Sequence, residues 1–134
     1  ERSGAKRVVI DSLSEIELYL VPEVRADLRL AVFRTLSALA KRGVTALVTV
    51  GMEDEFTGLR FSPSKLSFLT DAVVSLRFAE FEGELRKIMT VVKVRGCDHS
   101  ADIRQYTITD KGIELDSKVT GYDGLLTGQP VPRS

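Results

Sequence analysis

Hydrophobic and polar residues are grouped in blocks along the chain, and the order of the blocks predicts an α/β fold. Residues 7–12, with the sequence RVVIDS, are apolar at three consecutive positions and end in an acid and a hydroxyl, as expected of a strand buried on both faces of a parallel sheet. Residues 44–50 form a second run of this kind. We therefore expect Asp11 and Ser12 at the carboxyl edge of the sheet, where α/β folds place ligand chemistry.

Between these two runs the apolar spacing becomes helical. Pro22 is suited to the first position of a helix, and Lys41 and Gly43 are typical of a last turn and its C-cap. Apolar residues recur at helical spacing in between: Val24, Leu28, Ala31, Val32, Leu36 and Leu39. The pattern predicts a helix that begins at Pro22, stops at Gly43 and crosses over between two parallel strands.

Strands replace helices in the second half of the chain. Residues 51–64 have no periodicity and are expected to form a surface loop. Runs of β-branched and aromatic residues predict antiparallel strands at 72–78, 84–95, 104–109 and 113–115. Turns at residues 82–83 and 109–112 would join them into two hairpins before a Gly- and Pro-rich tail. The expected fold class is α/β, with parallel strands and a crossover helix continued by antiparallel hairpins, in one domain over residues 1–134.

Composition limits the partners of the protein. Its 134 residues, 43% hydrophobic and 28% charged, are typical of one soluble domain. Nineteen basic and nineteen acidic residues cancel, and three Tyr, six Phe and no Trp leave few rings for stacking on single strands, so nucleic acid and anionic membranes are not expected partners. One cysteine, Cys97, rules out an internal disulfide, and no apolar stretch reaches the length of a membrane span. We expect a cytoplasmic protein.

Asp11 and Ser12 stand where nucleotide-hydrolysing folds have their Walker B acid, which holds or orients magnesium. The usual companion of that acid is a glycine-rich loop ending in Lys and Ser or Thr, whose backbone N–H groups bind phosphates. None of the ten glycines is followed by that pair. Because the sequence begins with Glu1 rather than Met, we expect an upstream part of the protein that this sequence does not include.

Two cations end the longest predicted strand. Lys93 and Arg95 are two positions apart, so regular alternation places both on the face that carries Met89 and Val91. They would lie roughly 6.5 to 7 Å apart along the strand, which suits contact with neighbouring phosphates of one polyphosphate. Gly96 can then turn the chain so that three further side chains project beyond the strand: Cys97, Asp98 and His99. The alternative is a solvated basic edge that discourages strand pairing, and the spacing alone leaves both interpretations open.

Residues 93–99 (KVRGCDH) and the turn at 109–112 (TDKG) resemble the Lys-x-Arg-Gly-x-x-His segment and the downstream Thr-Asp-x-Gly turn of the KaiC family of RecA-like ATPases. Residues 7–12 are similar to the Walker B strand of that family, and residues 69–71 and 83–86 to stretches around its first hairpin. Order and spacing agree from residue 7 to about residue 130. The resemblance implies a partial RecA-like (P-loop NTPase) core, the C-terminal half of one ATPase domain, with the catalytic acids in the other half.

The resemblance also implies a hexameric ring of identical subunits in which ATP lies between neighbours. Carried over residue by residue, it implies that Lys93 and Arg95 contact the γ-phosphate of ATP on the neighbouring subunit, with a backbone contact from Val94. It places four further residues near the same nucleotide: Cys97, His99, Thr109 and Asp110. Asp11 would bind Mg²⁺ in its own subunit, with Ser12 nearby. The implied activity is hydrolysis of ATP that depends on assembly, and this chain alone is expected to be inactive.

Departures from the family pattern leave alternatives open. Some members phosphorylate an adjacent Ser-Thr pair, where this chain has Ser67 and Phe68. Ser67 is a candidate phosphorylation site or a plain loop serine, and a two-site cycle with a clock role is not expected because Phe68 has no hydroxyl. The alternative function is a non-catalytic interaction or nucleic-acid-docking module that keeps the RecA-like surface and binds through Lys93, Arg95 and the tail. Because the lack of a phosphate-loop strand would expose a sheet edge, we also expect self-association or domain exchange.

Overall fold

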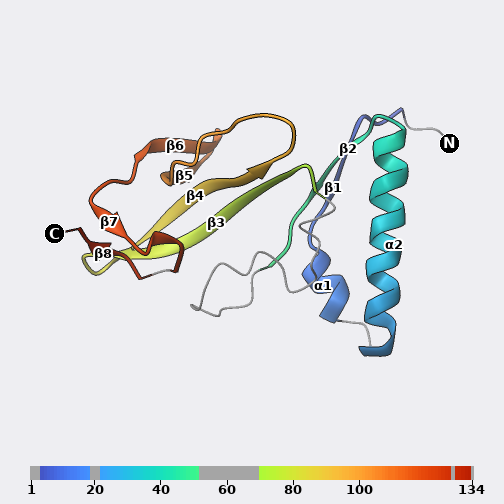
Figure 1. Ribbon diagram of the computed structural model, residues 1–134, viewed down its shortest axis with the longest axis horizontal. Helices are drawn as coiled ribbons and strands as arrows, with labels where there is room; N and C mark the ends of the chain where they lie inside the picture. Colours follow the sequence, from blue (N-terminus) through green and yellow to red (C-terminus); the bar gives the residue numbers. More distant parts are fainter. Residues whose placement is uncertain (1–3, 19–21, 52–69, 128, 134) are drawn as a thin grey trace. The chain divides into compact units, whose positions relative to one another are not determined.

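The computed structural model describes residues 4–18, 22–51, 70–127 and 129–133 (Figure 1). They fall into two compact units, the first within residues 4–51 and the second within residues 70–133. No helix in these described ranges has both the length and the apolar character needed to cross a membrane. The candidate phosphorylation site Ser67 and all of the predicted surface loop except Gly51 lie outside the described residues.

The first unit is the predicted strand, helix, strand arrangement. Its elements are β1 (Arg7–Ile10), α1 (Leu13–Leu18), α2 (Pro22–Lys41) and β2 (Thr45–Val48). β1 and β2 pair in parallel, so the predicted crossover is confirmed. After α2, Gly43 has a positive φ of 69°, and its N–H donates to the carbonyl of Ala40 at 2.9 Å, as a glycine C-cap does. The apolar pattern does not predict α1, because its residues mix apolar and polar types without a stripe.

The described elements of this unit cover one face of the parallel sheet. Val8 and Val48 are half-buried, whereas Val9 is 63% and Leu47 is 61% exposed. α2 packs against β2, and no other described element of the unit covers the opposite face. The prediction of strands buried on both faces is therefore wrong for the unit as it stands, because a parallel sheet needs a helical layer on each side to achieve that.

The second unit is a four-stranded antiparallel sheet in the order β3, β4, β5, β6, followed by a two-stranded one. Its elements are β3 (Ala72–Phe81), β4 (Glu84–Val94), β5 (Arg104–Thr109), β6 (Gly112–Lys118), β7 (Tyr122–Asp123), η2 (Leu125–Thr127) and β8 (Val131–Pro132). Both predicted hairpins are confirmed. The first turns through Glu82 and Gly83, which have φ of 51° and 82° and are typical of a type I′ turn. The composition of the tail does not predict β7, η2 or β8.

The core of the second unit lies where the tail packs on the first hairpin. Ala79, Phe81, Ile88 and Leu125 are buried together, and Tyr122 packs against them. The rings of Phe81 and Tyr122 meet edge to face, with their centroids 5.1 Å apart, a favourable aromatic geometry. The tail is therefore part of the core that holds the hairpin.

A β-bulge near the end of β4 changes which side chains share a face. Val73 pairs with Lys93 and Val74 pairs with Val91, so Val92 is an extra residue in β4. Paired residues point to the same side of a sheet and neighbouring residues to opposite sides. Lys93 therefore lies on the face of Val73, and Val91 lies on the other face. The regular alternation that would put Lys93 on the face of Val91 is wrong, because the bulge reverses it.

Candidate functional site

The carboxyl edge of the parallel sheet carries a hydrogen-bonded acid. Asp11 follows β1 and Thr49 follows β2, and the Thr49 hydroxyl donates to Oδ1 of Asp11. The backbone of Thr49 is fixed on both sides, since its N–H donates to the carbonyl of Ile10 at 2.9 Å and its carbonyl accepts the N–H of Leu13 at 3.0 Å. Asp11 is exposed, and its peptide bond with Ser12 is cis. The predicted acid thus lies at the predicted edge, with one oxygen held by Thr49.

Two serines beside this acid fix the start of α1. The Ser12 hydroxyl accepts the N–H of Glu15 at 3.4 Å, in the manner of an N-cap. The Ser14 hydroxyl accepts the N–H of Gly51 at 2.8 Å and donates to the carbonyl of the same residue at 3.3 Å. Ser12 lies next to Asp11, as predicted, but its hydroxyl caps a helix, and Ser14 ties that helix to the segment after β2.

The end of β4 is joined to the residues that precede β3. The Lys93 ammonium donates to the carbonyl of Thr70 at 2.9 Å, and the backbone N–H of Arg95 donates to the carbonyl of Asp71 at 2.7 Å. Lys93 is half-buried, whereas Arg95 lies just beyond Val94, the last residue of β4, and is exposed. Both cations therefore lie at one end of the sheet, with the Lys93 side chain half-buried and the Arg95 side chain exposed.

An exposed loop follows the two cations. Cys97 is a free, exposed thiol. His99 is also exposed, and its Nδ1 lies 3.1 Å from the carbonyl oxygen of Ser100. A carbonyl oxygen can only accept, so Nδ1 carries the hydrogen in this contact. Lys93, Arg95, Cys97 and His99 are thus brought to one region of the second unit.

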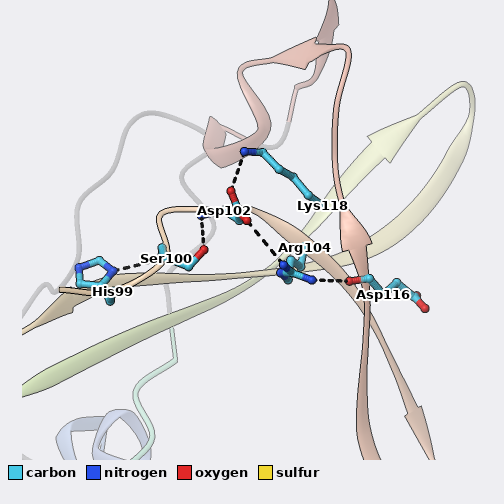
Figure 2. Close-up of polar contacts among 6 residues, drawn as sticks. All are labelled: His99, Ser100, Asp102, Arg104, Asp116 and Lys118. Atoms are coloured by element: carbon cyan, nitrogen blue, oxygen red, sulfur yellow. Dashed lines mark hydrogen bonds and ion pairs between the residues drawn. The ribbon is translucent and has the colours of Figure 1, made fainter.

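The loop returns to the sheet at Asp102, whose carboxylate contacts two cations on different strands (Figure 2). Oδ1 of Asp102 lies 2.6 Å from the Lys118 ammonium, and Oδ2 lies 3.6 Å from the Arg104 guanidinium. The hydrogen bond from Lys118 is the main cause that lowers the pKa of Asp102 below its ordinary value of 3.8. This acid is ionised at neutral pH and acts as a tie between strands.

Two other predicted residues lie elsewhere. The Thr109 hydroxyl donates to the Glu114 carboxylate at 3.1 Å and accepts the N–H of Lys111 at 3.2 Å, while Asp110 is exposed in the turn. β5 runs from the loop toward this turn, so the turn lies roughly 16 Å further along the strand. Within the second unit, Thr109 and Asp110 are not grouped with His99.

The fold and this edge define the class of protein. A small parallel sheet with a crossover helix, in a chain that continues into an antiparallel sheet, agrees with a RecA-like ATPase fold. The chain belongs to the KaiC family of ATPases: the family model described as "ATPase: KaiC" matches residues 1–120. The predicted family is therefore confirmed.

Sequence and structure similarity to individual KaiC proteins agree with this family assignment. The chain is 29% identical to the circadian clock protein KaiC3 of Synechocystis over 125 residues, which is 93% of this chain and 24% of that protein. It is 30% identical to the circadian clock oscillator protein KaiC of Thermosynechococcus vestitus, over 92% of this chain and 23% of that protein. The crystal structure of a KaiC-like protein from Pyrococcus horikoshii is similar with a TM-score of 0.70 and 26% identity, over 85% of this chain and 48% of that one. The chain spans about a quarter of the length of the two clock proteins.

Sequence reasoning missed two residues that lie beside predicted ones, Thr49 in the first unit and Asp102 in the second. Thr49 is the first residue after the second parallel strand, and the rule that placed Asp11 at the carboxyl edge would also have placed Thr49 there. Asp102 gives no such signal, because its partner Lys118 lies at the far end of β6. Only the register of β5 with β6 brings the two together.

Proposed function

We propose that this chain is the C-terminal half of a KaiC-family ATPase domain and contributes to two nucleotide sites. Asp11 serves the Mg²⁺–ATP of its own subunit, and the end of β4 serves ATP held by a neighbouring subunit in a hexameric ring. The observation that carries the proposal is the position of Asp11, held by Thr49 at the carboxyl edge of two parallel strands. The family match over residues 1–120 supports it.

The residues around Asp11 fit a magnesium ion. Mg²⁺ prefers oxygen ligands and is usually bound by one or two carboxylates together with substrate phosphates and water. Asp11 supplies one carboxylate, and its Oδ1 accepts the hydrogen bond from the Thr49 hydroxyl. We therefore assign Oδ2 of Asp11 to the metal or to its water. No group of three or more metal-ligating side chains occurs among the described residues. In a P-loop NTPase the other ligands are the Ser or Thr of the phosphate loop, phosphate oxygens and water, and the ion would neutralise phosphate charge.

The end of β4 fits the recognition of phosphate from a neighbouring subunit. Cations aimed at the transferred phosphoryl group stabilise the charge that develops on it. Arg95 is exposed, and the Lys93 ammonium donates to the carbonyl of Thr70. An ammonium has three N–H donors, so Lys93 can keep that contact and still bind a phosphate oxygen. We assign the γ-phosphate contacts to Lys93 and Arg95, and hydrolysis then requires a docked neighbour.

The remaining assignments concern the rest of the nucleotide. The nucleotide contacts assigned to four other residues follow from the family pattern: Val94, Cys97, Thr109 and Asp110. His99 is considered separately below. Because the turn with Thr109 lies apart from the loop, the two groups would contact different parts of one nucleotide or approach it from different directions.

A phosphate-release assay with Mg²⁺–ATP tests this proposal. The chain alone should show no turnover, because a phosphate loop supplies most contacts to the phosphates within a subunit. In the full-length ATPase that carries this chain, Lys93→Ala combined with Arg95→Ala should lower kcat without lowering the melting temperature. Clear turnover by the chain alone, or full activity of the double variant, would refute the proposal.

The open face of the antiparallel sheet favours a second candidate function, which is association with a second copy of this chain. Val74, Leu76 and Phe78 share this face of β3 and are 52%, 48% and 56% exposed. Leu85 on β4 pairs with Glu80, lies on the same face and is 68% exposed. Folded monomers rarely expose contiguous apolar patches beyond a few hundred Å². This face supports the expected self-association, which light scattering on a sizing column measures.

A further inference from the structure

Asp102 closes the exposed loop that follows β4 (Figure 2). Its two carboxylate oxygens contact Lys118 at 2.6 Å and Arg104 at 3.6 Å. Lys118 is the last residue of β6 and Arg104 the first of β5. The neighbouring backbone is tied as well, since the N–H of Val119 donates to the carbonyl of Ile103 at 2.8 Å. One carboxylate thus fixes the point at which the loop rejoins the sheet.

His99 is connected to this acid through Ser100. The N–H of Asp102 donates to the Ser100 hydroxyl at 3.1 Å, and Nδ1 of His99 donates to the Ser100 carbonyl at 3.1 Å. Figure 2 shows the three side chains in this order along the loop. With Nδ1 engaged, Nε2 is the ring nitrogen left to meet a ligand. The direction of Nε2 therefore depends on Ser100, and the position of Ser100 depends on Asp102.

We propose that Asp102 is a positioning residue for the nucleotide contact of His99. Lys118 and Arg104 fix Asp102, Asp102 fixes Ser100, and Ser100 orients the imidazole toward the nucleotide of the neighbouring subunit. Asp102 itself does not touch ATP. This inference rests on the proposed function, because it takes His99 to face a nucleotide.

The positioning can be measured on this chain without nucleotide. Asp102→Asn removes the charge that holds Lys118 and should speed amide hydrogen exchange over residues 97–101 about two- to fivefold, as expected for loss of an exposed ion pair. Asp102→Glu should restore slow exchange. Asp116→Asn is the matched control, since it removes the same charge from β6, where Asp116 accepts a hydrogen bond from Arg104 through its backbone carbonyl. Equal exchange in D102N and D116N would overturn the proposal.

The consequence for binding is measured on the full-length ATPase. His99→Ala and Asp102→Asn should each raise KM for ATP about two- to tenfold, and the double variant should be no weaker than His99→Ala, because both changes act through one contact. Additive losses in the double variant, or equal KM in D102N and D116N, would overturn the positioning role alone. If instead Lys93→Ala, Arg95→Ala and His99→Ala all leave KM and kcat unchanged, the proposed function itself fails.

Discussion

Replacement of Thr49 by valine isolates the hydrogen bond that holds Asp11. Valine keeps the β-branched shape of threonine, and the backbone contacts of Thr49 with Ile10 and Leu13 do not involve its side chain. Thr49→Val therefore removes one hydrogen bond to an exposed carboxylate. A net intramolecular hydrogen bond contributes about 1 kcal/mol, which corresponds to a roughly fivefold change in the fraction of Asp11 oriented for the metal.

The assay is the dependence of ATP hydrolysis on Mg²⁺ concentration in the full-length ATPase. Thr49→Val should raise the half-saturating Mg²⁺ concentration about fivefold, while Thr49→Ser, which keeps the hydroxyl, should change it little. Thr45→Val is the matched control, because Thr45 is an exposed threonine at the start of β2, the strand that Thr49 follows. The same Mg²⁺ dependence in T49V and T45V would show that Thr49 does not orient Asp11, whatever the other properties of the variants.

Three further predictions concern stability and assembly. Ile88→Ala should lower the free energy of unfolding, measured by urea titration, by about 3 kcal/mol, because Ile88 is only 1% exposed. The same change at Ile108, which is 63% exposed, should have little effect. Similar losses of stability at both sites would contradict the described core. Since Lys118 lowers the folded-state pKa of Asp102 below 3.8, this pair stabilises the fold above that pH and the contribution is lost as the pH falls through the lowered pKa. The difference in urea midpoint between the wild type and D102N should therefore be present at neutral pH and absent in strong acid, and a difference that persists there would refute the ion pair. Phe78→Lys should reduce self-association measured by light scattering, because it puts a charge on the open apolar face; an unchanged mass would exclude that face.

The sequence predicts those parts of the fold that have a local pattern. The crossover between β1 and β2 follows from apolar runs and from Pro22 and Gly43, and both hairpins follow from β-branched runs and their turns. The bulge at Val92 has no such pattern, because Val91 and Val92 are chemically alike and either could be the extra residue. The tail has no local pattern of this kind either, and it folds because Tyr122 and Leu125 pack on the first hairpin.

In the candidate site, too, the residues with a local sequence pattern could be predicted and those that depend on tertiary contacts could not. Asp11 could be located because it ends an apolar run, and the basic strand end because its residues resemble a family pattern. The network around Asp102 depends on strand register, which sums many weak side-chain preferences over the sheet. A reader of the sequence alone therefore finds the charged groups but not what holds them in place.

The bulge in β4 determines on which face of the sheet the charged side chain of Lys93 lies, although the valines that form the bulge are uncharged. In an unbulged ladder that continues the pairing of Val74 with Val91, Val92 would lie opposite Val73, and Lys93 would move to the open face. The contact of Lys93 with the carbonyl of Thr70 exists because one valine is left out of the pairing. Substitutions at positions 91 and 92 that remove or shift the bulge therefore redirect this cation without altering it.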